Sequence, residues 1–167
     1  LVNEFSSFAR MPSPVFKKIN LSEIILRAVN FLSMSSKSKI IFNKKESVFL
    51  INGDEEQLYR MFINLIKNSD EAIFERKQKT IDLEGLIELD IDKNNDYIIV
   101  SLSDNGNGIS NKEKIMTPYF TTKKNGTGLG LPIVNKIVNE HSGELTLTNK
   151  SHEKGVEILI TLPSINE

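Results

Sequence analysis

The chain has 167 residues with 22 acidic and 21 basic side chains, which gives a net charge of −1. This balance offers no electrostatic reason to expect nucleic acid or an anionic membrane as a partner. Because cysteine is absent, disulfides and thiolate metal sites are excluded, and no apolar run approaches the roughly 20 residues of a membrane span. Since the first residue is Leu1 rather than Met, we expect a fragment of a longer protein, whose remainder could hold a membrane anchor.

The N-terminal part of the chain predicts two helices separated by a linker, followed by two strands. Residues 1–10 carry apolar side chains near helical spacing, and two prolines end that helix, so residues 12–20 are interpreted as a linker. An amphipathic helix is predicted over 21–32, with Ser22 as its N-cap. Residues 39–53 predict two short strands joined by a polar turn.

The remainder of the chain alternates strands and helices around one polar loop. Asp54 is predicted to cap the longest helix, at 55–77. A loop rich in glycine, asparagine, threonine and lysine spans 106–130 and leads into a helix at 132–141. The predicted strands are 86–92, 97–104, 143–149 and 155–163. This mixed order indicates one sheet with helices on one face, an α/β sandwich.

Polar residues lie at the rim of the apolar face of the predicted 55–77 helix. At about 100° per residue, Asn68 falls at the edge of the apolar arc, beside Ala72. Asn64 and Glu71 lie further round on the same side. The amide oxygen of Asn68 could ligate Mg²⁺, which takes oxygen ligands and usually keeps phosphates and waters in its shell. Taken alone, this helix favours the simpler interpretation, a half-exposed asparagine with a local hydrogen bond.

The strand at 97–104 ends in a carboxylate that should point inward. Alternation of period two places Asp104 on the same face as the apolar residues of the strand, and a buried carboxylate needs hydrogen-bond donors. An adenine amino group would supply one donor; an Asx-turn with Asn105 or Gly106 is the alternative. Gly106 and Gly108 could let a flat ring approach the backbone, but a turn needs the same glycines.

A second glycine-rich segment precedes the helix at 132–141. Gly126, Gly128 and Gly130 alternate before it, and backbone amides at a helix N-terminus bind phosphate. The spacing is neither the dinucleotide fingerprint nor a Walker loop. In isolation, a surface loop remains an alternative.

Neither histidine is predicted to be catalytic. His141 is interpreted as a cation near the C-terminal dipole of its helix, and His152 lies in a polar turn. Neither has a neighbouring acid at the spacing of a metal site or a catalytic triad.

Four segments, in this order, resemble the sequence boxes of sensor histidine kinases. They are NLIKNSDEAI (64–73) for the N box, DNGNGI (104–109) for the G1 box, TPYFTTK (117–123) for the F box and GTGLGLPIV (126–134) for the G2 box. The resemblance covers nearly the whole chain. The segment FSSFARMPSP is similar to the part of NtrY-type nitrogen-regulation kinases that joins the dimerisation helices to the catalytic domain.

This resemblance implies the Bergerat ATP-binding fold, an α+β two-layer sandwich with a mixed sheet and three main helices on one face. It is shared with gyrase, the heat-shock chaperone and mismatch-repair ATPases. Residues 1–14 would be the end of a dimerisation helix and a linker, and residues 15–167 the catalytic ATP-binding domain. The implied cofactors are ATP and Mg²⁺.

The resemblance also implies a role for each matching residue. Asn68 becomes the Mg²⁺ ligand, Asp104 the reader of adenine, residues 121–126 the ATP lid and residues 128–131 the triphosphate lining. The residues placed at the nucleotide are Asn68, Glu71, Asp104, Gly106, Gly108, Ile109, Thr121, Thr122, Lys123, Gly126, Thr127, Gly128, Leu129, Gly130 and Leu131. Gly106 and Gly108 are interpreted as room for the nucleotide rather than for a turn.

Three positions depart from the family pattern. Asn64 stands where the hydrolytic cousins have a glutamate that activates water, which argues against a self-contained ATPase. Val156 stands where a threonine is frequent near adenine, and Glu71 where many members carry a basic residue, as we expect for the nitrogen subfamily. With Asn64 and Asn68 as the catalytic pair, the implied reaction passes the γ-phosphoryl group of ATP to a histidine on a separate domain.

The implied partners are that dimerisation and phosphotransfer domain and a response regulator, in a homodimer, with no nucleic acid. We expect the acceptor histidine upstream of Leu1, so the fragment should bind ATP without autophosphorylating. The domain would be cytoplasmic and the whole protein would lie in the bacterial inner membrane. The alternatives are a regulatory nucleotide-binding module, either pseudokinase or phosphatase-biased, that docks a response regulator, and a gyrase-type ATPase.

Overall fold

The computed structural model of the chain describes residues 11–110 and 130–166. Within them lie the strands β1 (Lys17–Asn20), β2 (Lys39–Lys44), β3 (Leu50–Gly53), β4 (Leu86–Asn94), β5 (Tyr97–Asp104), β6 (Glu144–Asn149) and β7 (Val156–Pro163). The helices of the described part are α2 (Leu21–Ser33), α3 (Glu55–Lys77) and α5 (Gly130–Glu140). None of these helices is both long enough and apolar enough to cross a membrane.

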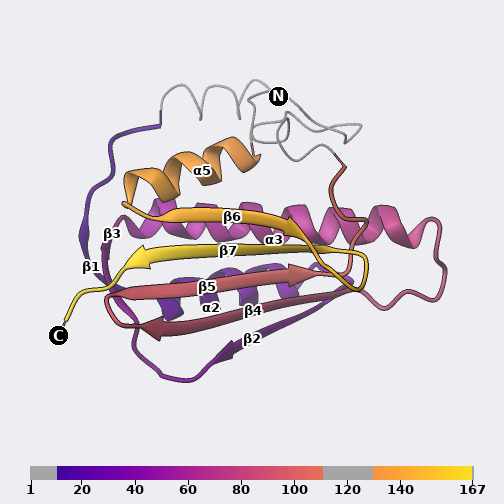
Figure 1. The fold of residues 1–167 in the computed structure, drawn as a ribbon, viewed down its shortest axis with the longest axis horizontal. Coiled ribbons are helices and arrows are strands. Elements are labelled where there is room, and N and C mark those ends of the chain that lie inside the picture. The colour runs from indigo at the N-terminus through magenta and orange to yellow at the C-terminus, as the bar shows by residue number, and fades with distance from the viewer. Residues whose placement is uncertain (1–10, 111–129, 167) are drawn as a thin grey trace.

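The main sheet has five strands in the order β2-β4-β5-β7-β6. The β2–β4 pair is parallel and the other pairs are antiparallel, so the sheet is mixed. Figure 1 shows the strands in front of α2 and α3, with α5 beside α3. The predicted α+β two-layer sandwich, with helices on one face of a mixed sheet, is confirmed.

The core lies between these two layers because each element presents one apolar face. The pattern of burial alternates strictly along β5 and β7, so that every second side chain points toward the helices. Helix α3 buries its apolar stripe against the sheet and packs between α2 and α5. Its N-cap Asp54 accepts a hydrogen bond from the backbone N–H of Gln57, and acidic residues fill its first turn and basic residues its last.

The predicted N-cap of α2 was wrong. Helix α2 begins at Leu21, and its N-cap is Asn20, whose Oδ1 accepts from the backbone N–H of Ser22 at 3.3 Å. The same oxygen accepts from the backbone N–H of Phe49 at 2.9 Å. Asn20 is the N-cap because its side chain accepts hydrogen bonds from both the first turn of α2 and the segment before β3. Ser22 instead lies fully buried within the first turn.

The predicted linker was wrong, and the pairing of the neighbouring strands was not predicted from the sequence. The predicted linker 12–20 contains β1, which pairs with β3 in a separate two-stranded sheet. The two short strands predicted in 39–53 are confirmed as β2 and β3, and they belong to different sheets, since β2 lies parallel to β4. Partners so distant along the chain leave no local signal, whereas a hairpin would carry its turn with it. The helix predicted over residues 1–10 lies outside the described residues.

The segment 11–17, here termed the N-terminal arm, is bound to the start of α3. The backbone N–H of Val15 donates to Asp54 Oδ2 at 2.8 Å, and Gln57 Nε2 donates to the carbonyl of Pro12 at 3.0 Å. Burial alone would raise the pKa of Asp54, but the backbone N–H donors of Gln57 and Val15 outweigh it and lower the pKa below its ordinary value.

His141 joins the arm to the end of α5. Its Nε2 accepts from the backbone N–H of Asp54 at 3.0 Å, and its Nδ1 lies 2.7 Å from the carbonyl of Ile137. The ring of Phe16 packs against it, with 5.0 Å between ring centroids. An Nε2 that accepts from an N–H carries no proton, so Nδ1 donates and the ring is neutral. The prediction of a cation at this position was therefore wrong.

Candidate functional site

Residues from four elements meet at one end of the sandwich. Helix α3 contributes Asn68, which is half-buried, and Ser69, which is buried. Strand β5 contributes its last residue, Asp104, only 3% exposed, as its alternation predicts. Strand β7 contributes its first residue, Val156, and α5 begins at Gly130. The predicted inward orientation of Asp104 is confirmed.

The Asp104 carboxylate is held by three hydrogen bonds from the protein. Its Oδ2 accepts from the hydroxyl of Ser69 at 2.7 Å. Its Oδ1 accepts from the backbone N–H of Gly106 at 2.9 Å and from that of Val156 at 3.4 Å. The bond to Gly106 is the Asx-turn that stood as an alternative in the sequence, so the inward orientation and the turn occur together.

The glycines around Asp104 are required by contacts within the protein. A Cβ atom on Gly106 would lie 2.7 Å from the Cβ of Ala72, so α3 packs directly on this loop. Gly108 has a φ of +81°, which L side chains rarely adopt. The sequence interpretation, which set a turn aside, was wrong at Gly106, whose N–H closes the Asx-turn; the nucleotide role of Gly108 stays a prediction. A Cβ on Gly155 (φ +132°) would lie 1.9 Å from the Asp104 carbonyl oxygen.

The loop after Asp104 is hydrogen-bonded to the start of β4 and to the end of α3. Asn105 Nδ2 donates to the carbonyl of Glu84 at 2.7 Å, and its Oδ1 accepts from the N–H of Leu86 at 2.8 Å. Arg76, in the last turn of α3, donates to the Asn105 carbonyl at 2.7 Å. These bonds fix the path of the chain where it leaves β5.

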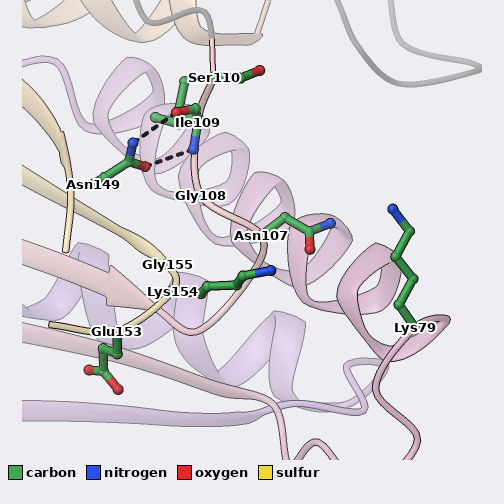
Figure 2. A pocket seen from close by; sticks show the side chains of 9 residues that line it. All are labelled: Lys79, Asn107, Gly108, Ile109, Ser110, Asn149, Glu153, Lys154 and Gly155. Atoms are coloured by element: carbon green, nitrogen blue, oxygen red, sulfur yellow. Dashed lines mark hydrogen bonds between the residues drawn. The ribbon is translucent and has the colours of Figure 1, made fainter. Parts of the chain in front are cut away.

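A cavity of about 510 Å³ opens beside the same loop. Gly108 and Ile109 line it, together with Asn149 from the end of β6 and the two lysines Lys79 and Lys154 (Figure 2). Asn149 holds the loop in place: its Nδ2 donates to the Ile109 carbonyl at 2.8 Å and its Oδ1 accepts from the Ile109 N–H at 2.7 Å. Figure 2 shows both bonds, with the two lysines on the side of Asn107.

The start of α5 lies against the amide of Asn68. A Cβ built on Gly130 would be 3.4 Å from Asn68 Nδ2 and 3.7 Å from its Oδ1, so a glycine leaves space beside this amide. Within residues 11–110 and 130–166, no group of three or more His, Cys, Asp or Glu side chains could hold a metal ion. One amide oxygen beside a helix N-terminus suits a Mg²⁺ ion whose other ligands are phosphates and waters.

The described residues bring together only part of the predicted site. Asn68, Asp104, Gly106 and Gly130 lie at one corner, and Ile109 and Leu131 pack against the core. Asn64 is half-buried and Glu71 is exposed, both on α3. The predicted residues Thr121, Thr122, Lys123, Gly126, Thr127, Gly128 and Leu129 lie outside the described residues.

Sequence reasoning missed three residues that build this corner, namely Ser69, Asn149 and Gly155. Ser69 carried a usable signal, since a serine within the buried arc of α3 needs a partner and so does an inward-facing Asp104. Asn149 and Gly155 carried none, because their roles depend on the pairing of β6 with β7 and of β7 with β5.

Residues 53–166 match the family model of the histidine kinase-, DNA gyrase B- and HSP90-like ATPases. The chain belongs to this ATPase family. Members of this family are ATPases, so the chain is an ATP-binding domain, and residues 111–129 of the matched stretch lie outside the described residues.

Two curated proteins illustrate the sequence similarity of this chain to known members of the family. Nitrogen regulation protein NtrY of Azorhizobium caulinodans is 34% identical over 97% of this chain and 21% of its own length. Sensor histidine kinase ZraS of Salmonella typhimurium is 34% identical over 99% of this chain and 35% of its own length. The chain thus spans well under half of either relative.

A solved structure supports the same fold. The catalytic domain of histidine kinase ThkA is 28% identical and superposes with a TM-score of 0.75, covering 89% of this chain and 95% of that one. The match extends over nearly the whole of that catalytic domain, so the two chains share the same fold.

Proposed function

We propose that this chain is the catalytic ATP-binding domain of a two-component sensor histidine kinase of the NtrY type. Its task would be to transfer the γ-phosphoryl group of ATP to a histidine on a dimerisation domain outside this chain. The observation that carries the proposal is the buried Asp104 carboxylate, placed at the same corner as the Asn68 amide and the N-terminus of α5. The three groups suit the base, the metal and the phosphates of one nucleotide.

Each group has a distinct role in the proposal. Asp104 accepts a hydrogen bond from the adenine amino group. Asn68 offers its amide oxygen to Mg²⁺, which neutralises phosphate charge when bound. Gly130 and Leu131 offer backbone amides to the triphosphate at the start of α5, and residues 121–126 would serve as the ATP lid. The protein's contribution to such a transfer is positioning and charge stabilisation.

The residue at position 64 distinguishes the proposed kinase from an ATPase that hydrolyses ATP on its own. It lies one helical turn before Asn68, and an amide cannot take a proton from water. The nucleophile must therefore be supplied already reactive, as the imidazole of a histidine would be. Hydrolysis of ATP by the chain alone that disappears in Asn64→Ala would contradict this role.

We further propose that the whole protein is a homodimer anchored in the bacterial inner membrane, with this domain in the cytoplasm and a response regulator as its phosphoryl acceptor. The relative named sensor histidine kinase ZraS supports this proposal, because the matched stretch covers only 35% of that protein and leaves room for sensing and phosphotransfer parts.

A reconstitution tests the proposal. The chain is mixed with its separately produced dimerisation domain, Mg²⁺ and ATP labelled at the γ-phosphate, and acid-labile, base-stable phosphate on histidine is measured. Label on the dimerisation domain that is lost in Asn68→Ala is the expected result. Tight binding of ATP without any phosphohistidine would instead favour a regulatory nucleotide-binding module.

A further inference from the structure

The Asp104 carboxylate has little acceptor capacity left. An ionised carboxylate offers about four lone-pair sites, two on each oxygen. The backbone N–H groups of Gly106 and Val156 occupy both sites on Oδ1, and the Ser69 hydroxyl occupies one site on Oδ2. One acceptor site therefore remains among the described contacts, and it lies on Oδ2.

The three hydrogen-bond donors to Asp104 differ in how strongly they fix the direction of the remaining acceptor site on Oδ2. The two donors to Oδ1 are backbone groups. They fix the position of Oδ1, but on their own they would still let the carboxylate rotate so that Oδ2 changes its direction. The Ser69 hydroxyl is the donor that holds Oδ2, at 2.7 Å in a fully buried position. It therefore sets the direction in which the remaining lone pair points.

We propose that Ser69 is the positioning residue for base recognition, because its hydroxyl leaves Asp104 with one oriented acceptor site for the 6-amino group of a purine. This inference rests on the proposed function, in which Asp104 contacts adenine. Ser69 also follows Asn68 directly on α3, so one turn of helix would align the base and metal ends of the same nucleotide.

Comparison of two nucleotides isolates this role. ATP and purine riboside 5′-triphosphate differ only in the 6-amino group, so the ratio of their dissociation constants measures that group's contribution. The wild-type chain with Mg²⁺ should prefer ATP at least about tenfold, as expected for a hydrogen bond to a charged acceptor. In Ser69→Ala this preference should fall at least about threefold, while binding of the analogue changes less.

A matched control separates recognition from stability. Ser22 is another fully buried serine, with its Oγ 3.0 Å from Asn20 Oδ1 and 3.1 Å from the Ser47 carbonyl, far along the chain from the site. Ser22→Ala should lower the urea midpoint but keep the wild-type ligand ratio. Ser69→Thr, which keeps a hydroxyl, should restore the ratio to within about twofold of wild type.

The outcomes are distinct. A wild-type chain that binds both nucleotides equally would refute the proposed contact of Asp104 with adenine. A wild-type preference that survives unchanged in Ser69→Ala, or that is lost equally in Ser69→Ala and Ser69→Thr, would overturn the role of the Ser69 hydroxyl.

Discussion

Asp104→Asn separates the structural role of the carboxylate from its role in recognition. The amide has the same shape, so its oxygen can keep both backbone bonds at the Oδ1 position. Its NH₂ group then replaces Oδ2, and the Ser69 hydroxyl can turn to accept from it, because a hydroxyl both donates and accepts. We therefore expect the free energy of unfolding to fall by only about 1–2 kcal/mol.

The same substitution should strongly weaken the binding of ATP. The remaining acceptor site becomes an N–H that faces the adenine amino group, so a hydrogen bond to a charged acceptor is lost. Such a bond is worth about 1.5–3 kcal/mol, which corresponds to a loss of roughly 10- to 150-fold in ATP affinity. Isothermal titration with Mg²⁺-ATP measures the affinity, and urea unfolding measures the stability.

Asp90→Asn is the matched control for this experiment. Asp90 lies exposed on β4, where its Oδ1 accepts from Asn43 at 3.1 Å, and its neutralisation changes the net charge equally. The Asp90→Asn variant should bind ATP with the same affinity as the wild-type chain. The reasoning fails if Asp104→Asn folds normally and binds ATP within about twofold of wild type, since Asp104 would then be a structural acid alone.

Three further expectations concern metal, backbone and pH. Asn68→Ala should weaken ATP binding in Mg²⁺ but not in EDTA, and titrations under both conditions would reveal an equal loss if the amide does not meet the metal. Gly155→Ala should destabilise the fold by more than about 3 kcal/mol in urea unfolding, because the added Cβ would lie 1.9 Å from the Asp104 carbonyl oxygen at a φ of +132°; a cost below about 1 kcal/mol would contradict this packing. Because its pKa is lowered on folding, Asp54 stabilises the fold above its ordinary value, near 4, and loses that contribution as the pH falls through the folded value. The stability difference between wild type and Asp54→Asn should thus be constant from about pH 5 to 8 and shrink below about pH 4, whereas a difference unchanged at pH 3 would refute the assignment.

The sequence predicted those features that depend on local periodicity. Alternation along β5 correctly placed Asp104 inside, and Asp54 was correctly identified as the cap of α3. Both follow from neighbours within a few residues, where apolar spacing and capping chemistry act directly.

The features that the sequence did not predict depend on partners far along the chain. Ser69 and Asp104 are 35 residues apart, and Asn149 and Ile109 are 40 apart, so no local spacing pairs them, although the inward positions of Ser69 and Asp104 could each be inferred from periodicity. His141 was misjudged for the same reason. Its position at the end of α5 suggested a cation, but the Asp54 N–H, 87 residues away, requires a neutral ring.

The position of α2 determines how short this domain can be made. The family match begins at residue 53, the last residue of β3, and so leaves out β1, α2 and β2. Helix α2 alone places five large apolar side chains in the common core: Leu21, Ile24, Ile25, Val29 and Leu32. At about 1.5–3 kcal/mol each, their burial contributes on the order of 10 kcal/mol, as much as the whole net stability of a typical domain. The autonomous folding unit therefore extends well upstream of the family's boundary, back to the residues that pair with β3 and contact the start of α3.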